Sequence, residues 1–106
     1  MVAVIFEVEM KPGRRQDYFD LAASLRPELE KIDGFISVER FESLAHKGKY
    51  VSLSFWRDEA AVKAWKAHAE HKVAQQQGKN EIFSDYRIRV AEVLRDYGMQ
   101  SDRASL

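Results

Sequence analysis

Alternation between two hydrophobic periods is the feature of this sequence that most constrains its fold. Four short segments repeat apolar residues at every second position, as half-buried strands do, and two longer segments between them have the spacing of amphipathic helices. The alternating segments are 2–8, 35–44, 50–56 and 86–95, and the helical segments are 18–32 and 59–77. The predicted order is strand, helix, strand, strand, helix, strand.

Local signals place the ends of these elements. Gly34 follows the first helical segment and Asp58 precedes the second, as expected for a C-terminal stop and an N-terminal cap. The segment 46–49 contains Gly48 and predicts a hairpin turn. Pro27 lies inside the first helical segment and predicts a kink there.

This order predicts an α+β fold of the ferredoxin-like βαββαβ type, in which both helices cover one face of an antiparallel sheet. We expect one domain over 1–97 and a polar C-terminal tail over 98–106. The residues expected to face the helices are Val4, Phe6, Val8, Val51, Leu53, Phe55, Ile88 and Val90. Those expected on the opposite face are Ile5, Glu7, Tyr50, Ser52, Ser54, Trp56, Arg87, Arg89 and Val93.

The face without helices mixes aromatic and aliphatic residues with charges of both signs, whereas a face bathed in water would be more uniformly polar. We therefore expect a homodimer in which two copies pair through this free sheet face.

Composition narrows the class of protein. The chain has 106 residues, no cysteine and equal numbers of acidic and basic side chains. These values predict no disulfide, no thiolate metal site and no electrostatic footprint for nucleic acid. The sequence has no candidate membrane span and no signal peptide, so we expect a cytoplasmic protein that does not associate with membranes.

Trp65, His68 and His71 combine an aromatic surface with groups that titrate near neutral pH. Triplet oxygen reacts slowly with closed-shell molecules, and an electron-rich substrate overcomes this by losing a proton and donating an electron. His68 or His71 is the candidate catalytic base, and Trp65 the candidate wall for an aromatic ligand. The alternative for each is structural: a core tryptophan and a half-solvated helix edge.

Trp56, Phe6, Tyr86 and Arg87 complete the candidate substrate-binding set, with Tyr86 or Arg87 stabilising a developing anion. Arg87 is equally suited to a structural ion pair, and Trp56 to a dimer seam. We predict no metal site, because the two histidines lack a third ligand.

Several motifs resemble the antibiotic biosynthesis monooxygenase family. They are Trp56 followed by Glu59-Ala60, Ala64-Trp65 nine residues after the first tryptophan, the His68/His71 pair, and Tyr-Arg-Ile-Arg-Val at 86–90. The resemblance covers about 2–97 and implies a dimeric α+β barrel. It also implies either a cofactor-independent oxygenase acting on phenolic or quinol-type substrates, or a heme-degrading enzyme.

Residue by residue, the resemblance to the heme-degrading members is partial. Trp65 matches their tryptophan, but their asparagine falls at Phe6 or Glu7 and their heme ligand near Gln75. The polyketide-oxidising members have a tryptophan that Trp56 matches and an asparagine that is Ser52 here. The resemblance thus favours a monooxygenase without cofactor, with heme as the alternative.

Two further alternatives belong to different functional classes. One is a non-catalytic dimeric module that binds a small hydrophobic molecule or acts under stress. The other is an RNA-recognition module of the same element order, which the lack of basic surplus disfavours.

Overall fold

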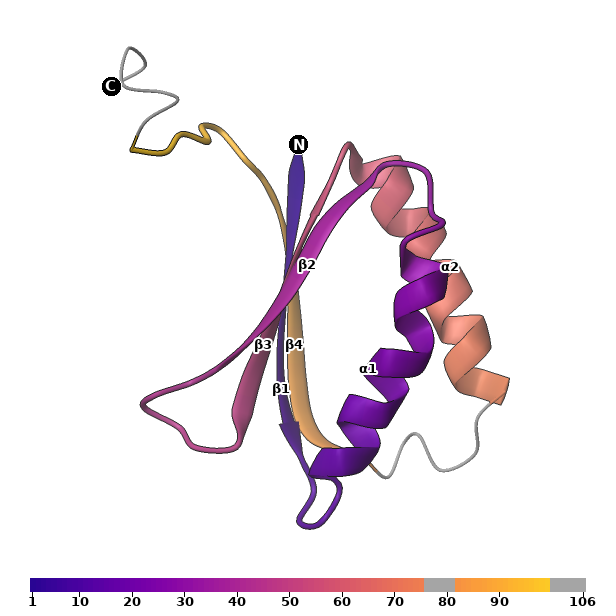
Figure 1. The fold of residues 1–106 in the computed structure, drawn as a ribbon, viewed down its shortest axis with the longest axis vertical. Coiled ribbons are helices and arrows are strands. Elements are labelled where there is room, and N and C mark those ends of the chain that lie inside the picture. Colours follow the sequence, from indigo (N-terminus) through magenta and orange to yellow (C-terminus); the bar gives the residue numbers. More distant parts are fainter. Residues whose placement is uncertain (76–81, 100–106) are drawn as a thin grey trace.

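The computed structural model describes residues 1–75 and 82–99. The elements in chain order are β1 (Val2–Met10), α1 (Arg15–Leu29), β2 (Phe35–Glu42), β3 (Lys49–Trp56), α2 (Glu59–Gln75) and β4 (Phe83–Glu92). The strands form one antiparallel sheet in the order β2-β3-β1-β4. Both helices lie on the same side of this sheet, and the other side is covered by neither (Figure 1). The predicted ferredoxin-like α+β fold is confirmed.

Most element ends follow the predicted signals. The Asp58 carboxylate accepts a hydrogen bond from the backbone N–H of Ala61 at 2.9 Å and so caps α2. Gly48 has a φ of 91° in the turn between β2 and β3, and β2 ends at Glu42, two residues earlier than predicted. Pro27 lies in the last turn of α1. The predicted stop after α2 at Gly78 and the tail from Gln100 onward lie outside the described residues.

The prediction for the two faces of β3 was wrong. Val8 pairs with Tyr50, Phe6 with Ser52 and Val4 with Ser54, and directly opposed residues share a face. The helix-facing residues of β3 are therefore Tyr50, Ser52, Ser54 and Trp56, while Val51, Leu53 and Phe55 lie on the open face. A shift of one residue exchanges all side chains between faces. Polarity favoured the aliphatic residues as the inward set, but the aromatic residues fill the core and the serines line a cavity.

The other strands face as predicted. Ile88 and Val90 of β4 oppose Phe6 and Val4 on the covered face, and Arg87 and Arg89 oppose Glu7 and Ile5 on the open face. The strand β1 is paired on both sides, with β3 and with β4.

The core between sheet and helices has two parts. One cluster contains Val8, Tyr18, Leu21, Tyr50 and Ile82, and the other contains Leu29, Trp56 and Ala61. Because Val8 pairs with Tyr50 and Val2 with Trp56, the two clusters lie toward opposite ends of β1. Smaller side chains, Ser52 and Ser54, occupy the stretch of β3 between them.

Candidate functional site

A cavity of about 490 Å³ lies between α2 and the covered face of the sheet. Its walls are mostly apolar and come from β1, β3, β4 and α2. The lining residues are Val4, Phe6, Ser52, Ser54, Trp56, Val62, Trp65, Lys66, Ile88 and Val90. An apolar hollow with few polar groups is typical of a binding site for a small organic molecule.

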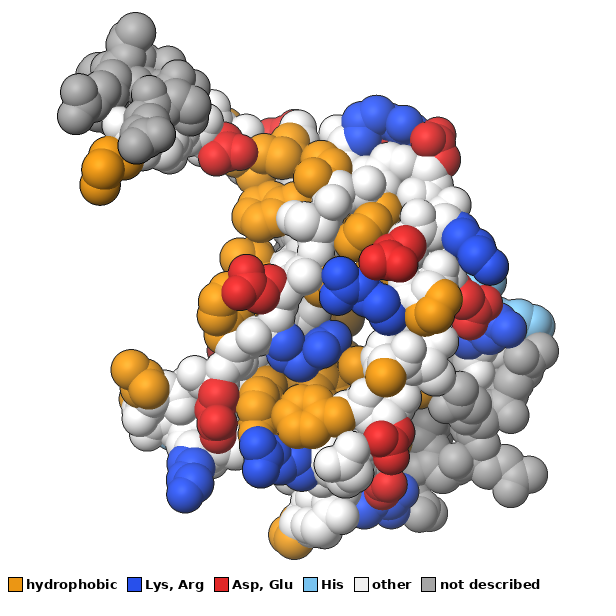
Figure 2. Space-filling model, in the orientation of Figure 1, with side chains coloured by type: hydrophobic (Ala, Val, Ile, Leu, Met, Phe, Trp, Pro, Cys, Tyr) orange, Lys and Arg blue, Asp and Glu red, His pale blue; other side chains and the backbone are white. Residues whose placement is uncertain are grey.

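A second cavity of about 190 Å³ lies between α1 and the β2 side of the same face. It shares five lining residues with the first: Phe6, Ser52, Ser54, Trp56 and Trp65. The remaining walls come mainly from α1 and include Tyr18, Arg26 and Arg40. Figure 2 shows basic side chains over the gap between the sheet and the helices, next to exposed apolar groups. The two hollows therefore meet at a common set of side chains.

Trp56 and Trp65 form an aromatic wall shared by both cavities. Their ring centroids are 6.4 Å apart with an interplanar angle of 27°. Trp56 is 1% exposed, and its indole N–H donates a hydrogen bond of 2.9 Å to the Ser54 hydroxyl. Phe35 meets Trp56 edge-on from the other side, at 5.3 Å. Trp56 is thus fixed by packing and a hydrogen bond, and the half-buried Trp65 lies on top of it.

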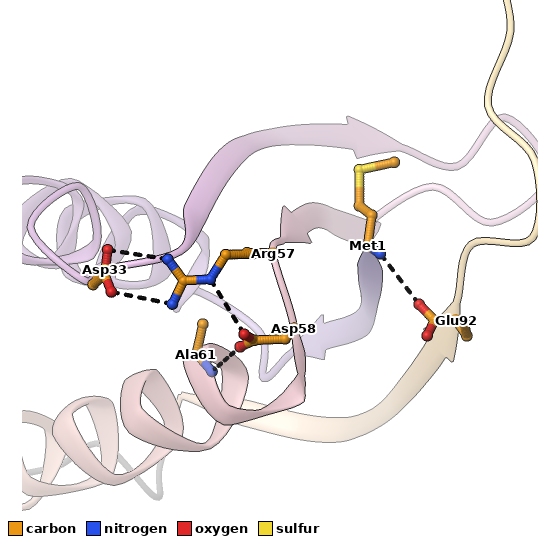
Figure 3. Close-up of polar contacts among 6 residues, drawn as sticks. All are labelled: Met1, Asp33, Arg57, Asp58, Ala61 and Glu92. Atoms are coloured by element: carbon orange, nitrogen blue, oxygen red, sulfur yellow. Dashed lines mark hydrogen bonds and ion pairs between the residues drawn. The ribbon is translucent and has the colours of Figure 1, made fainter.

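A polar clamp positions the junction between the two tryptophans. The guanidinium of Arg57 donates from both terminal nitrogens to Asp33, at 3.2 Å and 3.1 Å, and from Nε to Asp58 at 3.2 Å (Figure 3). Asp58 in turn caps α2, so one network joins the end of β3, the start of α2 and the loop after α1. The hydrogen bonds from Arg57 hold the pKa of Asp33 below its usual value, and that of Asp58 is lowered by the Ala61 N–H and by Arg57. The same network raises the pKa of Arg57.

The two candidate bases lie outside the cavity walls. Nε2 of His68 is 2.9 Å from the Glu28 carboxylate, which also contacts Lys72 at 3.3 Å. Partial desolvation of Glu28 opposes its ionisation, but these hydrogen bonds outweigh it and lower its pKa. The His68 ring also packs against Trp65, at a centroid distance of 5.9 Å. His71 is exposed on α2, and neither histidine lines either cavity.

The predicted substrate-binding residues fall into two groups. Trp65, Trp56 and Phe6 line both cavities. Tyr86 lines neither, although it packs against Phe6 at 5.9 Å, and Arg87 lies on the open face opposite Glu7. The structure brings the first three side chains together and separates Arg87 from them by the thickness of the sheet.

Sequence reasoning did not single out Tyr18 and Arg40. They come from α1 and β2, and the hydrogen bond from Arg40 Nε to the Tyr18 hydroxyl spans 3.1 Å. Neither belongs to a short motif, so only the packing of α1 against the sheet brings them to one place.

Among residues 1–75 and 82–99, no three His, Cys, Asp or Glu side chains are grouped as metal ligands. None of the described helices is both long and apolar enough to cross a bilayer.

The family model for antibiotic biosynthesis monooxygenases matches residues 1–77. The chain belongs to the antibiotic biosynthesis monooxygenase family. A relative named jasmonate monooxygenase ABM, from Pyricularia oryzae, is 46% identical over 93 residues, which are 88% of this chain and 43% of the relative. The chain thus spans less than half of that relative's length.

Solved structures agree with the fold of this family member. Rv0793 from Mycobacterium tuberculosis superimposes with a TM-score of 0.77 at 22% identity, covering 92% of this chain and 98% of that one. The heme-degrader MhuD from the same organism, with two hemes bound in its active site, gives a TM-score of 0.74 at 20% identity, covering 92% and 100%. At these identities the likeness concerns the fold alone.

Proposed function

We propose that this chain is a monooxygenase that oxidises a small aromatic or quinol-type substrate with molecular oxygen and without a bound cofactor. The observation that supports the proposal is the cavity under α2, with its tryptophan wall and its mainly aliphatic remainder. Family membership supports the reaction class. The flat indole surface of Trp65 suits a planar ring, because offset stacking of aromatic rings is favourable.

The proposed reaction needs no external reductant. When an activated methylene, such as that of an anthrone, loses a proton, the resulting carbanion donates an electron to oxygen, and the radical pair combines to a peroxide. Loss of water from the peroxide leaves a carbonyl: one oxygen atom enters the product, and the other leaves as water with both methylene hydrogens. A quinol reacts in the same way at a ring carbon, and loss of water from its peroxide leaves a hydroxyquinone, again with one oxygen atom in the product and one in water. The protein must orient the substrate, accept the proton and exclude bulk water.

Neither candidate base lines a cavity, so the proton would pass through an intervening water, and we assign the accepting role to His68 in preference to His71. His68 contacts Trp65, a cavity wall, and its ring is oriented by Glu28. Tyr86 packs against Phe6, a residue of both cavity walls, and does not itself line them.

Heme is the alternative cofactor, and the described residues do not fit it. The lining of both cavities includes no histidine and no cysteine, and His68 is engaged with Glu28. The one tyrosine in the lining, Tyr18, accepts a hydrogen bond from Arg40, and burial raises its pKa, which opposes the phenolate that iron would bind. Nor is the position that the resemblance gives for the heme ligand, Gln75, a strong iron ligand. We therefore derive no step through heme.

We also propose that two chains pair through the open face. The centre of this face is aliphatic, with Ile5 next to Leu53, and Phe41 is 46% exposed near it. Around this centre Glu7 pairs with Lys49 at 2.9 Å and with Arg89, so the charge of Glu7 is compensated, while Glu39, opposite Leu53, is exposed. An apolar centre next to a compensated charge suits a self-complementary surface.

The test is oxygen uptake with chelator-treated protein and a panel of quinols and anthrone-like phenols. Because one relative is named for jasmonate, jasmonate is included. We expect one O2 consumed per substrate, a strongly reduced rate for Trp65→Ala, and a loss of kcat without loss of thermal stability for His68→Gln. Lys63→Gln, an exposed change on α2, is the matched control. Oxygen uptake no faster than autoxidation in buffer, across the panel, would contradict the proposal.

A further inference from the structure

The charged side chains that line the two cavities are all positive. The lining contains Arg26, Arg40 and Lys66 and no aspartate or glutamate. The whole chain carries 17 acidic and 17 basic residues, so this bias is local. A hollow with apolar walls and cationic rims attracts a ligand that carries negative charge on an apolar body.

Arg40 is held in a defined orientation at the rim. Its Nε donates to the Tyr18 hydroxyl at 3.1 Å, and its Cζ lies 5.5 Å from the centroid of the Tyr18 ring. None of the described carboxylates forms an ion pair with it, whereas Arg26 is paired with Glu30 at 3.1 Å. The two terminal nitrogens of Arg40 therefore remain available, and that end of a guanidinium matches the two oxygens of a carboxylate.

Two hydroxyl groups accompany Arg40. Tyr18 is 4% exposed, and its hydroxyl accepts the bond from Arg40 while its own proton has no acceptor in the described part of the chain. Burial raises the pKa of Tyr18, so the phenol stays a neutral donor. Ser52 is the cross-strand partner of Arg40, lines both cavities and donates no hydrogen bond to any described residue. Arg40, Tyr18 and Ser52 thus provide hydrogen-bond donors without acceptors among the described residues, next to one another at the cavity wall.

We propose that Arg40, Tyr18 and Ser52 form a subsite for the carboxylate of a small organic acid, whose apolar body extends toward Trp56 and Trp65. The inference rests on the proposed function and narrows its substrate class to apolar monoanions. Arg40 and Tyr18 supply charge-assisted and neutral hydrogen bonds, and the tryptophan wall supplies the apolar contact. The subsite lies at the α1–β2 end of the cavity and leaves the α2–β4 end for the reacting group.

Calorimetric titration with a matched pair of probes tests the subsite. Phenylbutyrate and phenylbutyramide have nearly the same shape and differ in charge. We expect the acid to bind about tenfold more tightly than the amide, because hydrogen bonds to charged groups are stronger. Equal affinities for the two probes, or no binding of the acid up to millimolar concentration, would overturn the inference.

Three variants test which residue causes the tighter binding of the acid. Arg40→Gln removes the charge from an exposed strand position, and we expect it to bring the affinity for the acid down to that for the amide while the affinity for the amide is unchanged. Tyr18→Phe keeps the ring beneath the guanidinium and should weaken acid binding severalfold. Lys63→Gln removes one positive charge from the outer side of α2 and should retain the full preference. If Arg40→Gln kept the preference for the acid, the subsite would lie elsewhere and the assignment would be wrong.

The oxygen-uptake assay separates this inference from the proposed function. Acid-selective binding that depends on Arg40, with no oxygen uptake for any substrate, keeps the subsite and rejects the monooxygenase. Oxygen uptake with neutral quinols, without a preference for the acid in binding, would keep the monooxygenase and reject the subsite.

Discussion

The two faces of the sheet are built from the same four strands and differ in the side chains that they carry and in whether helices cover them. The covered face has large aromatic side chains at the ends of β3 and small hydroxyl side chains between them, so a hollow remains under α2. The open face has aliphatic side chains at its centre and paired charges around them. In this protein, the more uniformly aliphatic face of β3 is thus the one that no helix covers. Because β3 lines a cavity here, the polarity of its side chains does not mark its inner face.

The largest effect is expected on the open face. Leu53→Asp places a carboxylate at the centre of the proposed dimer surface, where it would be buried without a partner. We expect sedimentation at micromolar concentration to change from dimer to monomer, with the fold retained by circular dichroism. Leu44→Asp, at a residue that is fully exposed in the hairpin, is the control and should leave the dimer intact. A monomeric wild-type protein would remove the contrast between the two faces.

On the covered face, Trp56→Ala should destabilise the fold by about 3–5 kcal/mol, as large-to-small changes of buried aromatic residues do. The reason is that Trp56 packs with Phe35 and Trp65 and is nearly inaccessible. Urea unfolding measures the loss. Phe41→Ala, a similar truncation on the open face, should cost far less in a monomeric background such as Leu53→Asp. Equal losses would show that the two faces do not differ in packing.

At the edge between the layers, Gly34→Ala should destabilise more than Gly48→Ala. Both glycines have a positive φ, of 96° and 91°, so both substitutions carry backbone strain of about 1 kcal/mol or more. Only at Gly34 would the new Cβ also meet the Ala61 side chain, at 2.7 Å, whereas nothing lies within 4 Å at Gly48. Thermal unfolding of the two variants therefore isolates the close approach of the α1–β2 loop to α2. Identical unfolding temperatures would contradict that contact.

The smallest effect concerns the clamp at the β3–α2 junction. The pKa values of Asp33 and Asp58 are lowered in the folded protein, so their ionised forms stabilise it above the unfolded pKa of about 4. This contribution is lost as the pH falls through the folded values. We expect the unfolding temperature to drop below about pH 4, and Asp33→Asn to make that drop shallower while slightly lowering stability at neutral pH. If the unfolding temperature of Asp33→Asn fell with pH as steeply as that of the wild type, the clamp would be excluded as a source of the pH dependence.

The fold followed from the sequence because its signals are local. The alternation of Val2–Val8, the Asp58 cap and the hairpin glycine each act over a few residues, and together they admit few topologies. Of the site, Phe6 and Trp65 were predictable, because the alternation of β1 and the apolar stripe of α2 point them toward one another. Trp56 was singled out as a candidate, but it was expected on the face without helices, away from Trp65. The faces of β3 were not predictable, because Tyr50-x-Ser52-x-Ser54-x-Trp56 is less apolar than the set that alternates with it.

Arg40 and Tyr18 could not have been found from spacing, because 22 positions separate them and only the packing of α1 on β2 joins them. The histidines were identified by chemistry alone. The structure gives His68 a partner in Glu28 on the other helix, a contact that no local pattern encodes.

The chain contains two tryptophans, and both stand in the wall between the hollows. The tryptophan fluorescence of this protein consequently originates only at the wall shared by the two cavities. A ligand that binds there would quench or shift this fluorescence, so compound libraries could be screened with unlabelled protein.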